Sequence, residues 1–224
     1  MSTIYFKKTQ YLLTFIGVYI LLLQTDICAQ TLNMYDYLDF RVIDSLKVSL
    51  KSNKNLSLIY MNLADKYRNH NDSLFKYASQ GLQIAQKENN KTVEAFLYSL
   101  LGYATFYKKN YAKGIVLVNR GLNIAKDIES DSLESIISRK LGLLYILKNN
   151  HDTSIICFSR AHYFFSNSKF EHIANKSLYL KNEHCYLLEN MAESYLKLQY
   201  FEYAIDTYYT LIRKIRKYEL RQYY

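Results

Sequence analysis

A seven-residue phrase that returns at a fixed distance is the feature that most constrains this chain. Residues 81–87 read GLQIAQK and residues 121–127 read GLNIAKD, forty positions apart. The same shift brings the Leu-Gly pair at 101–102 onto the Leu-Gly pair at 141–142. Self-similarity at one period of about 20–50 residues is typical of proteins whose units stack side by side and pack only on their neighbours. The period therefore predicts a repeat architecture.

Each unit carries two apolar stripes at helical spacing, separated by a polar break of four to six residues. In the first unit, Ile59 and Leu63 belong to one stripe, and Leu74, Ala78 and Leu82 belong to the next. This spacing predicts two antiparallel helices per unit, and no stretch alternates as a strand would. The 224 residues include no proline, which is compatible with an almost entirely helical chain.

Glycines and capping residues fit the same interpretation. The five glycines that follow residue 29 all lie within predicted helices, where glycine costs about 1 kcal/mol relative to alanine. Each aligns with a small residue of another unit, as Gly81 and Gly121 do with Ala161. We expect neighbouring helices to approach closely there, since a larger side chain would block the contact. Asp72-Ser73 and Asp152-Thr153 precede two predicted helices and are expected to act as N-caps.

The first 29 residues differ in character from the rest. Two lysines precede an apolar run of 13 residues, Tyr11 to Leu23, which is followed by the polar stretch QTD. Ile27, Cys28 and Ala29 come next, and Ala29 would be the small residue before the cleavage site. The run is shorter than the roughly 20 residues of a spanning helix and fits the core of a secretory signal peptide. We predict a signal peptide over residues 1–29 and an exported protein, in the periplasm or at the outer membrane of a Gram-negative bacterium. An uncleaved membrane anchor and a lipoprotein modified at Cys28 are the alternatives.

The net charge indicates which classes of binding partner to expect, and the cysteines raise the question of a disulfide. The net charge is +9, and residues 212–224 (IRKIRKYELRQYY) hold five basic residues and one acidic residue. A basic surface is compatible with nucleic acid or with acidic lipid, and export disfavours nucleic acid. Cys157 and Cys185 follow the predicted signal. An export compartment permits a disulfide between them, but two cysteines are no disulfide framework and buried free cysteine is common, so two free thiols are the favoured interpretation.

Position by position, the units resemble the tetratricopeptide-repeat (TPR) family. In that family a large apolar residue and a small residue in the first helix are followed by an aromatic, and the second helix alternates small and bulky residues. First helices carry the pattern as Leu63/Ala64/Tyr67, Leu101/Gly102, Leu141/Gly142/Tyr145 and Met191/Ala192/Tyr195, and second helices as Gly114/Val118/Gly121, Ser154/Phe158/Ala161 and Ala204/Tyr208/Leu211. The resemblance covers residues 56–215. It implies an all-α fold, a right-handed α-solenoid of antiparallel helix pairs with about four units.

Several features depart from the family pattern. The period of 40 exceeds the family's, which is about 34 residues, and the proline that usually ends each unit is absent. The step from Gly142 to Ala192 is 50 residues, and the ten extra residues belong either to a longer first helix or to a loop near residues 166–169. We expect an N-terminal capping helix within residues 30–55 and the repeat domain over residues 56–224.

No catalytic motif is present, so we do not expect an enzyme, a cofactor or a metal site. Every glycine after residue 29 is assigned to a helix, which leaves no phosphate-binding loop, and neither GxSxG nor HExxH occurs. His70 and His151 lie in the polar turns NHND and NNHD, where solvated histidine is the simpler interpretation. Glu189 and Glu193, four residues apart on one helix, are compatible with a metal, a basic partner or a solvated face.

The family's binding surface is concave and lined by first helices. Transferred onto this sequence, the candidate partner-binding residues are Tyr103, Phe106, Tyr107, Arg139, Leu143, Glu189 and Glu193, and the first unit offers Met61, Asp65, Arg68 and Asn69. We expect Tyr103, Tyr107 and Arg139 to be exposed, whereas Phe106, Ile146 and Leu147 are equally compatible with packing on neighbouring helices. Tyrosine and arginine are frequent in binding hot spots.

The sequence supports two candidate functions. The favoured one is an exported scaffold that binds a protein or peptide ligand in this groove, either alone or as the sensing part of a signalling regulator, since similar repeats occur in such regulators. The alternative is a membrane-surface protein that contacts acidic lipid weakly through Arg213, Lys214, Arg216 and Lys217. A nucleic-acid partner is not expected.

Overall fold

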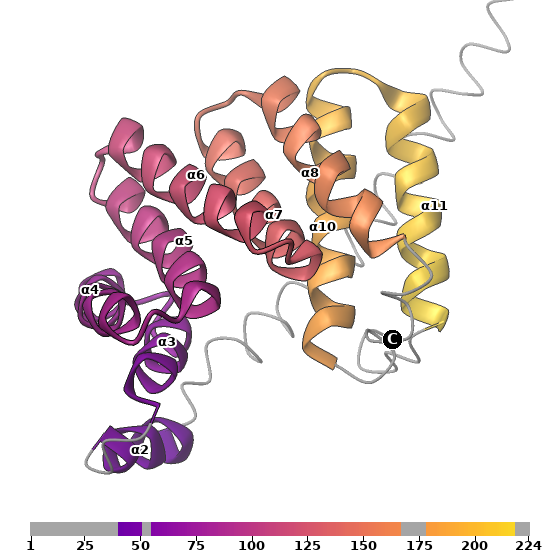
Figure 1. The fold of residues 1–224 in the computed structure, drawn as a ribbon. Coiled ribbons are helices and arrows are strands. Elements are labelled where there is room, and N and C mark those ends of the chain that lie inside the picture. The colour runs from indigo at the N-terminus through magenta and orange to yellow at the C-terminus, as the bar shows by residue number, and fades with distance from the viewer. Residues whose placement is uncertain (1–39, 51–54, 167–177, 218–224) are drawn as a thin grey trace, which may run out of the picture. The chain divides into compact units, whose positions relative to one another are not determined.

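The computed structural model describes residues 40–50, 55–166 and 178–217, which form helices joined by short turns (Figure 1). The helices are α2 (Phe40–Ser49), α3 (Leu56–Lys66), α4 (Asn71–Lys87), α5 (Lys91–Tyr107), α6 (Tyr111–Asp127), α7 (Asp131–Leu147), α8 (His151–Phe165), α10 (Leu178–Lys197) and α11 (Phe201–Lys217). They form the pairs α3/α4, α5/α6, α7/α8 and α10/α11, and each pair packs on the next. The predicted all-α solenoid of helix pairs is confirmed.

From α4 to α8 the helices begin every twenty residues, at positions 71, 91, 111, 131 and 151. Three residues separate each helix from the next, which is shorter than the predicted break. The middle residue of these turns has a positive φ, as at Lys109 (64°) and Glu129 (51°). The residue after it donates its N–H to the carbonyl five positions back, as Ser130 does to Ala125 at 3.0 Å. This bond satisfies a carbonyl at the end of the preceding helix and turns the chain sharply.

The helix caps differ in part from those expected. Asp72 and Asp152 lie inside the first turns of α4 and α8 rather than before them. Asn90, Asn110 and Asn150 are the N-caps of α5, α6 and α8, and each side-chain oxygen accepts the N–H three residues on. An acid in the first helical turn still interacts favourably with the helix dipole. For α8 the expected capping role therefore belongs to Asn150, two positions earlier, whereas the N-cap of α4 is His70, whose side chain forms no capping hydrogen bond.

The expected close approach of helices occurs at the glycines. A Cβ on Gly102 of α5 would lie 2.6 Å from the carbonyl oxygen of Gly114 on α6, and one on Gly114 would lie 2.8 Å from that of Gly102. A Cβ on Gly121 would lie 2.5 Å from the carbonyl oxygen of Ala95. Real Cβ atoms do not approach backbone so closely, so these positions let α5 and α6 pack backbone against backbone. The repeated phrase therefore marks where a second helix meets its first helix.

The core continues from one pair to the next. Leu74, Leu82 and Leu97 belong to a buried cluster of α3, α4 and α5, and further clusters join α5 through α8 and then α8 to α10. Helix α2 contacts α3 and lies within the segment predicted to cap the solenoid. Helix α10 has 20 residues, three more than the 17 of α7. The predicted loop near residues 166–169 falls largely, and the predicted signal peptide wholly, outside the described residues.

Candidate functional site

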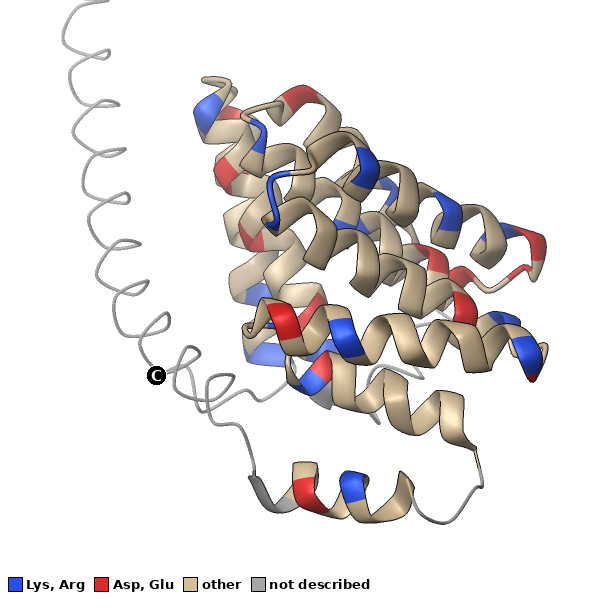
Figure 2. Cartoon of the chain, turned by 90° about the vertical axis from the view of Figure 1, so that its left-hand side faces the viewer, with Lys and Arg blue, Asp and Glu red and all other residues tan. Residues whose placement is uncertain are grey.

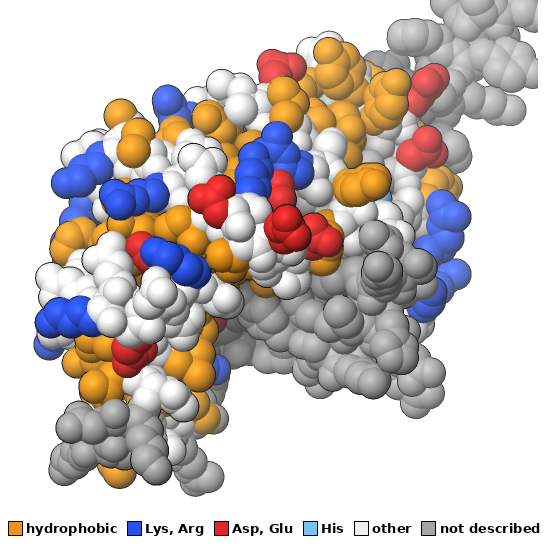
Figure 3. Space-filling view, in the orientation of Figure 1, with side chains coloured by type: hydrophobic (Ala, Val, Ile, Leu, Met, Phe, Trp, Pro, Cys, Tyr) orange, Lys and Arg blue, Asp and Glu red, His pale blue; other side chains and the backbone are white. Residues whose placement is uncertain are grey.

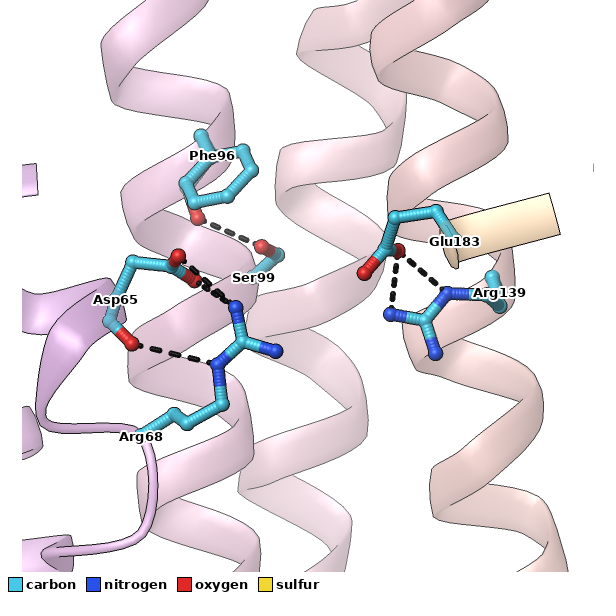
Figure 4. Close-up of polar contacts among 6 residues, drawn as sticks. All are labelled: Asp65, Arg68, Phe96, Ser99, Arg139 and Glu183. Carbon is cyan, nitrogen blue, oxygen red and sulfur yellow. Dashed lines mark hydrogen bonds and ion pairs between the residues drawn. The ribbon is translucent and has the colours of Figure 1, made fainter. Parts of the chain in front are cut away.

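The first helices of the pairs, α3, α5, α7 and α10, contact one another in that order. We call the surface that they form the first-helix face. It bears the predicted site residues of α5 and α7, together with a group of charged side chains. We call Asp65, Arg68, Arg139, Lys140 and Glu183 the charged cluster; Figure 4 shows four of its members in line across these helices.

Two tyrosines of α5 lie one helical turn apart on this face. Tyr107 is 50% exposed, and Tyr103 is half-buried. Their hydroxyl oxygens are 3.2 Å apart and their ring centroids 4.9 Å apart. Burial, followed by the hydrogen bond with Tyr107, raises the pKa of Tyr103. The Tyr103 hydroxyl therefore stays protonated and remains able to donate a hydrogen bond.

The expected exposure of Arg139 is wrong. Its side chain is buried and forms an ion pair with Glu183 of α10, with Nη2 and Nε at 2.6 Å and 2.7 Å from the same carboxylate oxygen (Figure 4). Glu183 occupies the position that Val93 and Leu133 hold in the two preceding units, 90 and 50 residues earlier. An acid at that buried position draws the guanidinium inward, because an isolated buried charge is strongly unfavourable. Arg139 thus ties α7 to α10.

Phe106 is also buried, at 3% exposure, and its ring centroid lies 4.7 Å from that of Tyr111 at the start of α6. Its role in the structure is packing within the pair α5/α6. Leu143 is half-buried and packs against the cluster that joins α8 to α10. Of these predicted residues on α5 and α7, Tyr107 is therefore exposed, whereas Tyr103 and Leu143 are half-buried.

Glu189 and Glu193 come together on α10 as their spacing predicts. Glu193 is exposed and Glu189 is half-buried. Burial, and then the charge of Glu193, raise the pKa of Glu189. Burial and the same two carboxylates raise the pKa of Tyr208 to about 12, which places both acids near α11. They therefore interact with the second helix of their own pair.

At the other end of the face, Arg68 Nη2 lies 2.9 Å from each carboxylate oxygen of Asp65, and its Nε donates to the Asp65 carbonyl at 3.3 Å. Both residues are half-buried. Ser99 of α5, drawn between the two ion pairs in Figure 4, donates to the Phe96 carbonyl at 2.6 Å. The ion pairs Asp65–Arg68 and Arg139–Glu183 are therefore formed by residues on the two sides of α5.

Lys140 is the residue that sequence reasoning missed. Its side chain is 8% exposed, and its Nζ lies 4.8 Å from the centroid of the Phe96 ring. Burial is the main cause that lowers its pKa to about 8, while Asp65 and Glu183 raise it and the two arginines lower it. Lys140 aligns with Leu100, a core residue forty positions earlier. A lysine in that apolar position was the available signal.

Other candidate chemistry is limited. Cys157 and Cys185 are free and buried, and burial raises their pKa values to about 11 and about 12. Within the described residues, no group of three or more histidine, cysteine or acidic side chains is placed to hold a metal ion. The same part of the chain contains no helix whose length and apolar character would let it cross a membrane.

The basic end of α11 is mostly accessible. Arg213, Arg216 and Lys217 are exposed and Lys214 is half-buried. Figure 3 shows basic side chains over the C-terminal part of this helix. Elsewhere, both acidic and basic positions are distributed over the helices, as Figure 2 shows for one side of the chain. The four basic residues within residues 213–217 therefore make the end of α11 basic, whereas both acidic residues of this helix lie nearer its start.

In fold, the chain is similar to TPR-like helical repeat proteins. BtubC (BKLC) from P. vanneervenii has a TM-score of 0.62 at 15% identity, over 88% of this chain and 80% of that one. RapI has a TM-score of 0.61 at 11% identity, over 88% and 71%, and MamA has 0.50 at 16%, over 84% and 94%. No protein-family model and no curated protein matches the sequence. The resemblance to the TPR family is thus confirmed in the fold.

Proposed function

We propose that this protein is an exported scaffold that binds a peptide segment of a partner protein on its first-helix face. The observation that carries the proposal is a row of accessible apolar side chains near the C-terminal ends of successive first helices. Tyr107 on α5 and Leu147 on α7, forty positions apart, are 50% and 49% exposed. Leu196 on α10, one position before the equivalent residue Lys197, is 40% exposed. A row of this kind suits the apolar side of a helix or an extended peptide.

The polar setting of this row supports the proposal. The paired hydroxyls of Tyr103 and Tyr107 offer hydrogen bonds beside the apolar contacts. Tyrosine contributes a large contact area at a small entropic cost, which is why it is frequent in hot spots. The shared TPR-like fold is compatible with a scaffold role and identifies no partner.

Selection from a random 12-residue peptide library displayed on phage tests the proposal. The full chain serves as bait, and selected peptides are then measured against a Tyr107→Ala/Leu147→Ala variant. The matched control is Tyr209→Ala, which removes a tyrosine of similar exposure (54%) from the second helix α11. We expect peptides whose affinity falls at least about tenfold in the double variant and stays within about twofold in the control. Peptides that bind both variants like the wild type would place binding elsewhere.

Export is tested separately by fractionating native cells and immunoblotting. A soluble periplasmic band a few kilodaltons below the 26.6 kDa of the full chain supports signal cleavage and a stand-alone scaffold. A band at full length or above in the inner membrane contradicts cleavage and favours an anchored sensor of a signalling regulator.

Helix α11 favours a second candidate function, contact with a membrane surface. Its exposed basic residues are joined on the same helix by exposed Phe201, Tyr203 and Tyr209. Basic and aromatic residues on one helix are typical of binding at acidic lipid surfaces. The test is flotation with vesicles of phosphatidylglycerol and phosphatidylcholine, compared with phosphatidylcholine alone. If this function holds, replacing Arg213, Lys214, Arg216 and Lys217 by glutamine abolishes binding to the acidic vesicles; unchanged binding refutes it.

A further inference from the structure

The charged cluster holds one more cation than its acids neutralise. Arg68, Arg139 and Lys140 contribute three positive charges, and Asp65 and Glu183 contribute two negative charges. Both acids are engaged at short distance by an arginine, at 2.9 Å in the first ion pair and 2.6 Å in the second. The positive charge that remains is that of Lys140.

Among the described residues, no acidic side chain forms an ion pair with Lys140. Across residues 40–50, 55–166 and 178–217, its Nζ forms no ion pair and no hydrogen bond. What it meets instead is the face of the Phe96 ring, with Nζ 4.8 Å from the ring centroid. Such a contact attracts a cation and replaces only part of the hydration that burial removes. Within the described residues, the ammonium group therefore has this ring contact but neither an ion-pair partner nor a hydrogen-bond partner.

Lys140 lies on one of the helices that carry the proposed peptide site. Lys140 lies on α7 and Phe96 on α5, the helix that also carries Tyr103 and Tyr107. The charges of Arg139 and Arg68 both lower the pKa of Tyr103, so its hydroxyl lies within electrostatic range of both ion pairs. A ligand that contacts both α5 and α7 would thus find a protonated hydroxyl on one helix and an ammonium group on the other.

We propose that Lys140 forms the subsite for one side-chain carboxylate, from an aspartate or glutamate, of the peptide bound on the first-helix face. The proposal rests on the function proposed above and specifies its ligand. One carboxylate balances the single surplus charge of the cluster, whereas a phosphate group, with a charge of about −1.5 to −2, would exceed it. Charge-assisted hydrogen bonds from the ammonium to a carboxylate are about twice as strong as neutral ones, so the subsite selects for acid over amide.

The experiment uses the peptides selected on the wild-type chain, resynthesised with a fluorescent label. Each aspartate or glutamate is replaced singly by asparagine or glutamine, and affinities are measured by fluorescence anisotropy. Binding is compared among the wild type, Lys140→Met, Lys140→Gln and the control Lys126→Met, which removes an exposed lysine from α6. Phage display joins the C-terminus of each peptide to the coat protein, so selection requires no free terminal carboxylate.

We expect one acidic position whose neutralisation weakens binding to the wild type and to Lys126→Met by about tenfold or more. The same change should alter binding to both Lys140 variants by less than about twofold. The proposal is overturned if every acidic position has the same effect in the wild type and in the Lys140 variants, or if the peptides that depend on Tyr107 and Leu147 contain no acid. If no peptide depends on Tyr107 and Leu147, the peptide-binding function itself fails, and this subsite with it.

Discussion

Replacing Lys140 by methionine should stabilise the folded protein at neutral pH. Methionine keeps much of the side-chain length while removing the buried charge. Burial lowers the lysine pKa from 10.5 to about 8, and each pKa unit corresponds to about 1.4 kcal/mol. The charged lysine thus destabilises the fold by about 3 kcal/mol. Loss of the cation–π contact with Phe96 lowers the free energy of unfolding of the variant by about 0.5–2 kcal/mol. We expect a net gain of about 1–3 kcal/mol in the free energy of unfolding at pH 7.

The gain should shrink as pH rises. Because the lysine pKa is lower in the folded state, the unfolded chain holds more protons between pH 8 and pH 10.5, and wild-type stability rises across that window. The electrostatic part of the difference falls from about 3 kcal/mol at pH 7 to about 1 kcal/mol at pH 9.5. The other four members of the charged cluster are present in both proteins, so their titration cancels in the difference to first order.

Urea unfolding followed by circular dichroism at pH 7 and pH 9.5 measures both quantities. Lys126→Met, at an exposed position of α6, is the matched control and should change stability by less than about 0.5 kcal/mol. A Lys140→Met variant that is less stable than the wild type at pH 7 would refute the account of a buried ammonium without an ion-pair partner. A gain that is the same at both pH values would also refute it.

Three further substitutions test the packing, each by urea unfolding. Glu129→Gly should stabilise the protein by about 0.5–1 kcal/mol, because a non-glycine residue is strained at φ 51°; destabilisation would contradict this. Gly102→Ala should destabilise it by about 1–3 kcal/mol despite the better helix propensity, since the new Cβ would lie 2.6 Å from a backbone oxygen, and a neutral result would mean that α5 and α6 separate easily. Arg139→Met should cost about 3–5 kcal/mol by leaving Glu183 buried and unpaired. Adding Glu183→Leu should restore most of that loss, and failure to do so would show that the pair acts through more than charge.

The fold was well predicted because the repeat period and the spacing of apolar residues can both be read directly along the sequence, without knowing which distant residues meet. The forty-residue period and the helical spacing of apolar residues fixed the helix pairs, and the alignment of Gly121 with small residues located a close helix contact. The turns were predicted too long, since polar residues such as Asp72 and Asp152 continue past the point where the helix begins. Polar residues occur both in the turns between helices and in the exposed first residues of a helix, so polarity alone does not locate the boundary.

The site was harder to predict because its main feature depends on partners from different helices. The exposure of Arg139 was inferred by transferring the family's binding positions onto this sequence, and such a transfer considers each position without its neighbours. It cannot register that Glu183, 44 residues further on, supplies a buried acid. Charged residues at positions that other units fill with leucine or valine were the overlooked signal, and they identify both Glu183 and Lys140.

The three-residue turns have a consequence for how such a chain can grow. The turn within a pair and the turn between pairs have the same length and the same positive φ, so from α4 to α8 the backbone repeats every twenty residues. Only the side chains distinguish odd helices from even ones. Inserting a single helix with its turn would leave every local backbone conformation intact, yet it would exchange the two faces of all that follows. A duplication of forty residues preserves this parity, which makes the helix pair the smallest unit that can be added or removed.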